Sequence, residues 1–354
     1  MPQPHASGYF RTDYAQDSHL LQTRGQRAAA LVGLLAAAAF PFLASPFLLD
    51  LGNQVLIAIV GSVALMLLTG YAGQVSLGHA GLMAAGAFTT GILARETGAP
   101  FWIALPASGL AGALIGFLFG LPSLRLRGLY LAVSTLALHF IVIHAGQEYE
   151  TRRGLSSGVV IEPPSLAGLE LFDPRAWYAV LFICAAATVM FALNLLRSRT
   201  GRAWRALHGR EPVAEALGIP VARAKVSAFV VASTLTALSG SLFAYYRGFV
   251  SSEAFSMFLT IQYVAMIIIG GMGSILGAVL GAAFVTLFPY AIEASLAQIP
   301  GGDSMSSIIF AVNYAAFGLV MILFLLFEPQ GLVGIWRRVR NWFLLWPFRQ
   351  RPLK

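Results

Sequence analysis

Charged residues are scarce in this chain of 354 residues: they make up 11% of it, whereas soluble domains carry about 25%. Hydrophobic residues account for 58% of the sequence, and the mean hydropathy is +0.75. Several uninterrupted apolar runs reach the ~20 residues that a helix needs to cross a bilayer. The scarcity of charge and the apolar runs together predict an all-α polytopic membrane protein.

Cysteine and lysine are rarer still. A single Cys184 excludes a disulfide framework and a cysteine metal cluster. The two lysines, Lys225 and Lys354, do not follow glycine, so the chain has no G-x-x-x-x-G-K-[ST] phosphate loop and cannot bind ATP in that way. His139 and His144 have the wrong spacing for a metal site on a helix. Nothing nominates catalytic residues, and we expect neither an enzyme nor a cofactor held by this chain.

The apolar runs predict about ten spans, and positive charge orients them. The segments that would lie inside hold 18 of the 23 Lys and Arg residues, and this asymmetry predicts cytoplasmic N- and C-termini. The net charge of +8 is therefore a topology signal and not a nucleic-acid signal. The predicted spans are 28–49, 53–70, 75–94, 101–121, 128–147, 176–196, 226–247, 256–272, 274–294 and 307–327.

The longest charged interior segment, residues 197–225, holds seven Arg or Lys. Since one charge costs about 2.5–3.5 kcal/mol at the bilayer centre, this segment must lie outside the lipid. Its pattern predicts a short helix capped by Thr200 and ended by Gly209, and a second helix over 213–217 ended by Gly218. The predicted apolar edge of the second helix is Val213, Ala214 and Leu217. Two short helices suggest a docking element; an ordinary loop that only fixes topology is the alternative.

Two glycine-rich stretches, 70–81 and 270–281, fall at membrane breaks. Each glycine costs about 1 kcal/mol in a helix relative to alanine, and irregular backbone in a membrane persists only where protein or a water-filled cavity satisfies it. The stretches are candidate hinges or pathway linings; close helix packing is the alternative. The hinge or packing glycines are Gly70, Gly73, Gly78, Gly81, Gly270, Gly271, Gly273 and Gly277. The candidate pathway residues are Gln74, Ser76, His79, Tyr130, Ser134, Thr135, Gln262 and Asn313.

The two ends of the chain differ from its middle. Residues 1–27 form a polar tail, and residues 335–354 form a basic-aromatic tail typical of a membrane-interface anchor. Between them, 28–334 is the predicted transmembrane domain. We expect the first span to be retained, although its AAAAFPFLAS sequence leaves cleavage open.

Five stretches resemble one known family, in order along the chain: GYAGQVSLGHAG, RLRGLYLAVSTLAL, EPVAEALGIPVARAK with AYYRGFV, GGMGSILGAVLG and FEPQGLVG. They are similar to the LivM-type permeases of branched-chain amino-acid ABC transporters. The resemblance implies a multi-pass protein of the bacterial inner membrane. Its implied partners are a second, LivH-type permease, two ATP-binding cassette subunits that bind the ATP, and a periplasmic solute-binding protein.

The resemblance also implies that the charged segment is the coupling loop that docks on the ATPase. The residues that it assigns to coupling are Arg205, Glu211, Glu215, Ala216 and Gly218. Relatives of similar sequence carry urea, short amides or aromatic acids, and Thr151-Arg-Arg-Gly-Leu departs from the family pattern. The solute is therefore branched-chain amino acids or a related small polar molecule. The alternative from another class of protein is a stand-alone secondary transporter or channel. Such carriers usually hold acidic residues within their spans for ion coupling. The predicted spans of this chain hold almost none, and Glu293 is the main exception.

Overall fold

The computed structural model describes residues 24–126, 128–155, 158–166, 169–170, 173–296, 306–328 and 330–345. Helices make up most of them, which confirms the all-α prediction. The helices are α2 Arg24–Leu43, α3 Pro46–Leu65, α4 His79–Thr97, α5 Phe101–Gly120, α6 Leu129–Arg152, α7 Pro174–Arg197, α8 Arg199–Leu207, α9 Glu211–Ala216, α10 Val221–Arg247, α11 Met257–Gly270, α12 Ile275–Leu296, α13 Ser306–Phe327 and α14 Gly331–Leu345. The short elements are the π-helix η1 Met66–Tyr71, the 3₁₀ helices η2 Pro122–Leu124 and η3 Ser252–Phe255, and the strands β1 Val159–Val160, β2 Ser165–Leu166, β3 Leu169–Glu170 and β4 Phe249–Val250.

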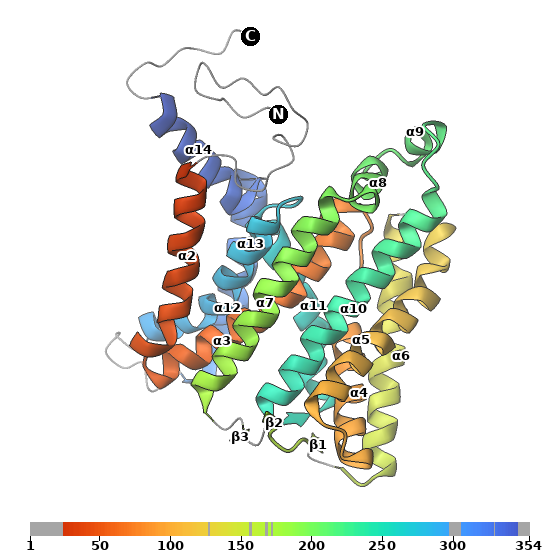
Figure 1. Ribbon diagram of the computed structural model, residues 1–354, viewed down its shortest axis with the longest axis vertical. Coiled ribbons are helices and arrows are strands. Elements are labelled where there is room, and N and C mark those ends of the chain that lie inside the picture. The colour runs from red at the N-terminus through yellow and green to blue at the C-terminus, as the bar shows by residue number, and fades with distance from the viewer. Residues whose placement is uncertain are drawn as a thin grey trace.

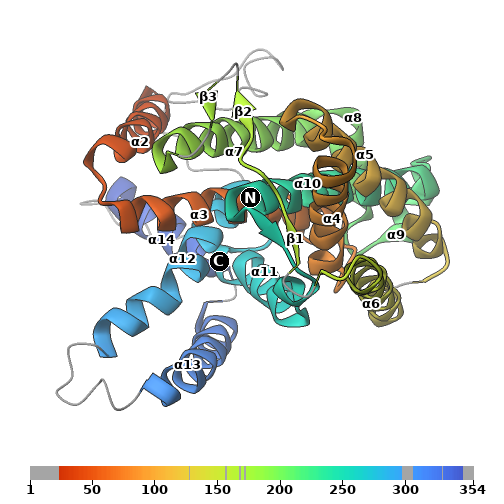
Figure 2. The same cartoon turned by 90° about the horizontal axis from the view of Figure 1, so that it is seen from below.

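Helices α3, α4 and α10 form the centre of the bundle, and the other long helices surround them (Figures 1 and 2). The apolar stretch of α3 is 83% buried, whereas that of α7, at the edge, is 28% buried. Helices α4 and α10 approach closely through glycine. A Cβ atom at Gly240 would lie 1.9 Å from the Met83 carbonyl oxygen, and one at Gly86 would lie 2.0 Å from that of Ala237. Small residues thus set the distance between these two helices.

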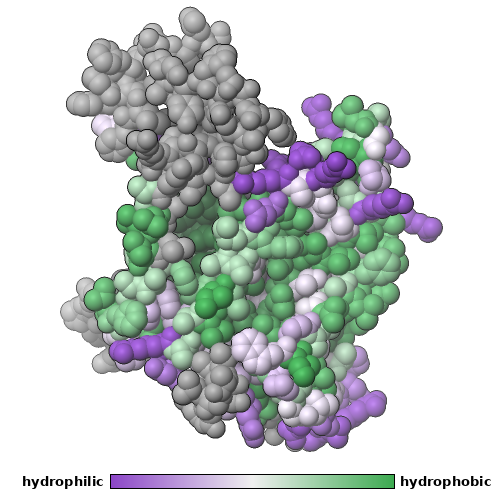
Figure 3. Space-filling model, viewed as in Figure 1, coloured by the Kyte–Doolittle hydropathy of each residue, from purple (hydrophilic) through white to green (hydrophobic). Residues whose placement is uncertain are grey.

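Six helical segments among the described residues are long and apolar enough to cross a membrane: Pro46–Tyr71, Phe101–Leu124, Leu129–Arg152, Pro174–Arg197, Val221–Arg247 and Ile275–Ser295. The bent pair Tyr314–Phe327 and Gly331–Arg340 would make a seventh span. Figure 3 shows the matching surface, a hydrophobic band between hydrophilic residues at two opposite ends. The protein is therefore a multi-pass membrane protein. The count of ten spans stays a prediction; the helices at four of its positions, α2, α4, the 14-residue α11 and α13, are outside this set of six.

The predicted boundary between the first two spans is wrong. A single span over 28–49 was expected, but α2 ends at Leu43 and α3 begins at Pro46. The Ser45 hydroxyl accepts a hydrogen bond from the Leu48 amide at 3.4 Å, and Pro46 occupies the first turn, where its missing N–H is harmless. Asp50 consequently lies inside α3 and not in a loop between spans.

The described chain starts and ends at the end of the molecule that also carries α8 and α9, on the opposite side from them (Figure 1). At the opposite end, β1 pairs antiparallel with β4, with Val159 opposite Val250, and ties the segment after α6 to the segment after α10. Because both ends of the described chain lie at one end of the molecule, the arrangement fits an even number of membrane crossings. That this end faces the cytoplasm stays a prediction. The first 23 residues and the last nine, which are part of the predicted basic-aromatic tail, lie outside the described residues. The predicted boundary between the transmembrane domain and the C-terminal tail, at residue 334, falls within α14.

Candidate functional site

Helix α8 is anchored to the bundle by a buried tryptophan. The side chain of Trp204 is fully buried, and its indole N–H donates to the Ser227 hydroxyl on α10 at 3.1 Å. The predicted cap was wrong by two residues, because Ser198 and not Thr200 caps the helix, with its hydroxyl accepting from the Gly201 amide at 3.3 Å. This buried contact therefore fixes α8 to α10.

Helix α9 stands at the tip of the molecule and presents a small apolar surface. Glycines with positive φ end α8 and α9, +82° at Gly209 and +80° at Gly218, as predicted. Ala214 is buried and packs inward, whereas Val213 and Leu217 are 51% and 75% exposed. The other exposed residues of α9 and its turn are Pro212, Glu215, Ala216 and Gly218. Of the three residues of the predicted apolar edge, Ala214 thus packs against the protein, and Val213 and Leu217 face outward.

Two of the predicted coupling residues bond within the protein. Arg205 donates from its guanidinium to the carbonyl of Leu196 near the C-terminus of α7, where a cation is favourable. The Glu211 carboxylate forms an ion pair with Lys225 on α10, with 2.7 Å between Oε1 and Nζ. These bonds place Arg205 and Glu211 where they tie α8 and α9 to the long helices.

Lys225 is one of the buried charged residues of the protein, with 3% of its surface exposed. Besides Glu211, its ammonium lies 3.4 Å from the Ser123 carbonyl in η2. Its own backbone carbonyl accepts a hydrogen bond from the Gln74 side chain at 3.5 Å. Lys225 therefore joins three segments: the short helix α9, the turn after α5, and the first glycine-rich stretch.

The first glycine-rich stretch is a break in the helical structure, as its composition predicted. The α3 helix loosens into the π-helix η1, and residues 72–78 are not helical before α4 begins at His79. The glycines allow close approach: Gly70 lies against the Gly273 backbone, Gly73 against His208, and Gly78 against the Thr135 carbonyl. The packing interpretation holds for these residues, and the hinge role stays a prediction.

The second stretch forms the turn between α11 and α12. A Cβ atom at Gly270 would lie 1.9 Å from the Gly277 carbonyl oxygen, so these two positions hold the helices in contact. Gly271 lies against the carbonyl of Gln330 before α14. The two stretches meet in space at Gly70 and Gly273, where the Gly273 amide lies 3.2 Å from the Met66 sulfur.

Two of the predicted pathway side chains, Thr135 and Ser76, serve the backbone of the break. The Thr135 hydroxyl accepts from the Leu77 amide at 2.9 Å, and Ser76 accepts from the Gly78 amide at 3.4 Å. His79 is buried, and its ring lies 4.5 Å from that of Tyr263 on α11. Of the remaining residues, Tyr130 is 76% exposed, Ser134 is half-buried, and the Asn313 side chain lies outside the described residues. His139 packs against Gly81, but no group of three metal-ligating side chains occurs among the described residues.

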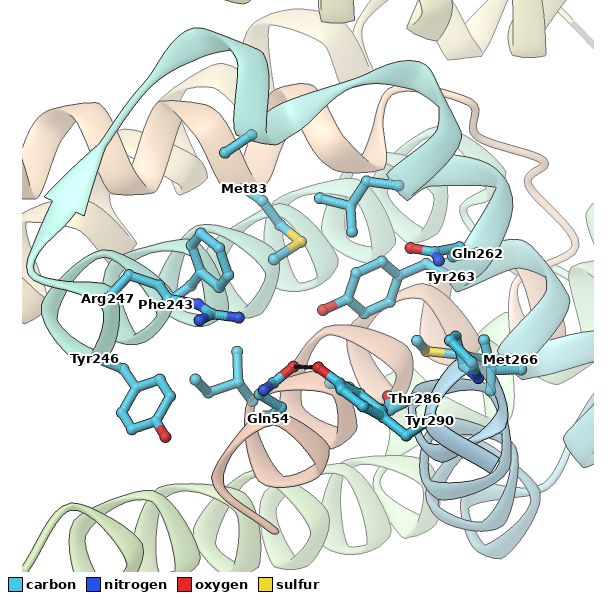
Figure 4. Close-up of a pocket in the computed structure, with 16 residues that line it drawn as sticks. Gln54, Met83, Phe243, Tyr246, Arg247, Gln262, Tyr263, Met266, Thr286 and Tyr290 are labelled. Atoms are coloured by element: carbon cyan, nitrogen blue, oxygen red, sulfur yellow. Dashed lines mark hydrogen bonds between the residues drawn. The ribbon is translucent and has the colours of Figure 1, made fainter. Parts of the chain in front are cut away.

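A cavity of about 240 Å³ lies between α3, α4, α10, α11 and α12, toward the β1–β4 end (Figure 4). Its floor is buried, with Met83, Tyr263 and Met266 each at most 4% exposed, whereas Arg247 at its mouth is exposed. Among the predicted pathway residues whose side chains the structure describes, Gln262 alone lies on its wall. The lining residues are Gln54, Ile57, Ala58, Met83, Phe243, Tyr246, Arg247, Ala254, Leu259, Gln262, Tyr263, Met266, Val285, Thr286, Pro289 and Tyr290.

A hydrogen-bond network supports one side of this cavity. The Tyr290 hydroxyl donates to the Gln54 Oε1 at 3.1 Å, and the Gln54 amide donates to the Asp50 carboxylate at 2.7 Å. Asp50 also accepts from the Tyr246 hydroxyl, which in turn lies 3.4 Å from the Asn53 amide. The carboxylate thus fixes Gln54 and Tyr246, which line the cavity.

This network was not predicted from the sequence. Asp50 was assigned to a loop, and Gln54 and Tyr290 are single polar residues in apolar runs. The signal that was available is the Ser45-Pro46 pair, which begins α3 before Asp50 and places Asp50 and Gln54 one turn apart on one helix.

The sequence comparisons agree with this architecture. The family described as branched-chain amino acid transport system, permease component, matches residues 47–326. The chain belongs to this permease family. The LivM permease of Salmonella typhimurium is 32% identical over 86% of this chain and 74% of its own length, and LivM of Escherichia coli is 32% identical over 87% and 75%.

A LivH permease of Methanocaldococcus jannaschii is 22% identical over 68% of this permease and 77% of its own length. No solved structure matches the chain. As a member of the family, the permease is the membrane component of an ABC import system.

Proposed function

We propose that this permease forms one half of a heteromeric pore in the bacterial inner membrane, beside a second, LivH-type permease. Two ATP-binding cassette subunits bind the ATP and dock on its α8–α9 segment, and a periplasmic binding protein delivers the solute. The solute is a branched-chain amino acid, as the names of the LivM relatives suggest, with a urea-like amide or an aromatic acid as the alternatives. The positive charge of residues 197–225 supports a cytoplasmic position for the segment.

The observation that carries this proposal is a continuous set of contacts from α9 to the cavity. Glu211 of α9 pairs with Lys225, and the Lys225 carbonyl holds Gln74 within the glycine-rich break. At the other end of the break, His79 contacts Tyr263, which forms part of the cavity floor. A displacement of α9 by the ATPase would therefore move the break, and with it the floor of the cavity.

Alternating access requires two arrangements of similar energy. The break at residues 72–78 makes few helical hydrogen bonds, and α4 begins beyond it with the Ala80 amide held by the Thr260 hydroxyl at 3.0 Å. If the α8–α9 end is cytoplasmic, the cavity in this structure faces the periplasm. Movement of α4 against α11 would then close the cavity outward and open it inward.

The test is co-purification of the tagged permease with its co-expressed ATPase and second permease. We expect Val213→Asp with Leu217→Asp to abolish recovery of the ATPase, because a charge would replace each exposed apolar side chain of α9. The matched control is Val160→Asp, a 65% exposed valine at the opposite end, which should leave recovery unchanged. Wild-type permease that purifies alone and moves solute with an ion gradient would contradict the proposal and indicate a secondary carrier.

A further inference from the structure

The cavity carries one cation and no acid among its described lining residues. That cation, Arg247, lies over the Phe243 ring at 5.8 Å and makes no ion pair within the described part of the chain. An arginine fork matches a carboxylate in geometry and charge. Arg247 is thus placed to receive a carboxylate at the mouth of the cavity.

Acceptors line the opposite wall. Proline has no N–H, so Pro289 leaves the Val285 carbonyl without the donor that a helix would supply. The side chains of Gln262 and Thr286, on α11 and α12, also make no hydrogen bond with other described residues, and Figure 4 shows Gln262 at the end of the cavity opposite Arg247. These oxygens suit an ammonium group, because each is an acceptor that needs a donor.

The whole site is close to neutral in charge. Asp50 lies directly behind Gln54 and Tyr246 and offsets the charge of Arg247. The remaining wall is apolar, with Ile57, Met83 and Met266 among its residues. The volume of about 240 Å³ is far larger than the ~10–15 Å³ that a single water needs, so the cavity can admit a small organic solute.

We propose that this cavity is a solute-binding site within the permease, selective for the zwitterion of an α-amino acid with a short aliphatic side chain. Arg247 binds its carboxylate, the acceptors of α11 and α12 bind its ammonium group, and the methionines contact its side chain. The inference rests on the proposed function. It adds that the permease itself, and not only a binding protein, binds both charged groups of the solute.

The test is equilibrium binding of radiolabelled L-leucine to the full transporter in lipid nanodiscs, without the binding protein. Arg247→Gln should weaken binding by roughly tenfold to a hundredfold, the range expected for hydrogen bonds to a charged group, and Arg247→Lys should lose less. Arg175→Gln is the matched control, because Arg175 is also exposed at this end but lies outside the cavity lining. Unchanged binding in Arg247→Gln would overturn the proposal.

Two competitor probes test the zwitterion. L-leucinamide, which lacks the carboxylate, and 4-methylpentanoate, which lacks the ammonium group, should each compete much more weakly than leucine. Equal competition by 4-methylpentanoate or benzoate would overturn the zwitterion assignment and indicate a simple anion site. Assembly and basal ATP hydrolysis of the wild-type complex are measured in the same samples, so a failure of the proposed function is seen separately from a failure of this site.

Discussion

The ion pair between Glu211 and Lys225 makes the sharpest prediction for stability. Glu211→Gln removes the carboxylate and leaves the Lys225 ammonium buried, with 4% of its side chain exposed. Removal of one partner of a buried pair costs about 3–5 kcal/mol. Because 23% of the Glu211 side chain is exposed, water can partly replace the carboxylate, and we expect a loss of about 3 kcal/mol.

The double variant Glu211→Gln, Lys225→Met should be more stable than Glu211→Gln alone, because the unpaired charge is gone. The free energy of unfolding is measured by titration of the purified permease from a mild detergent into a denaturing one. Glu148→Gln serves as the control, since its partner Arg152 is 76% exposed and the pair lies on one helix face, where such a pair contributes about 0.5 kcal/mol or less. The losses of stability in Glu211→Gln alone and Lys225→Met alone are compared with the loss in the double variant. A double-variant loss equal to the sum of the two single losses, within about 0.5 kcal/mol, would refute the reasoning, since independent sites behave in that way.

Three further predictions concern packing and the cavity wall. Gly240→Ala should destabilise the permease by about 1–3 kcal/mol, since its Cβ would lie 1.9 Å from the Met83 oxygen; Gly318→Ala, with open space around it, is the control, and equal thermal melting of the two would contradict this account. Trp204→Ala should cost about 3–5 kcal/mol and release α8 to protease, whereas Trp204→Phe should lose mainly the bond to Ser227, about 1 kcal/mol; equal protease cleavage in both variants would argue against the anchor. Asp50→Asn should cost about 1–3 kcal/mol, because an N–H₂ group, which accepts no hydrogen bond, replaces one of the two oxygens that accept from Gln54 and Tyr246. A thermal melt that does not change would show that the network is not formed.

The sequence predicted the features that depend on local chemistry. Glycine in a helix is unfavourable, and the stretch from Gly70 to Gly81 is indeed broken. Positive φ favours glycine, and Gly209 and Gly218 end their helices. The apolar runs located most of the long helices to within a few residues, because in a membrane only a helix satisfies its own backbone there.

The parts that failed depend on partners distant in sequence. Lys225 lies at the end of a charged segment that was expected only to lie outside the lipid, and its burial was not predicted; Glu211 and Ser123 make that burial possible. The assignment of Arg205 to docking stays a prediction, but its bond to the Leu196 carbonyl of α7 was not predicted from the sequence. The cavity is built from five helices, and a side chain such as Tyr290 has no local pattern that marks it as a wall residue.

The central claim, that α9 controls the floor of the cavity, is tested by the reactivity of a single cysteine. Met266→Cys in a Cys184→Ser background places one thiol on the cavity floor, and a membrane-impermeant thiol reagent is applied to the reconstituted transporter from the side of the β1–β4 end. We predict labelling in the resting state, protection when ATP is trapped, and loss of this protection in Glu211→Gln, Lys225→Met. Labelling that is the same with and without trapped ATP, in a transporter that still moves solute, would contradict the account.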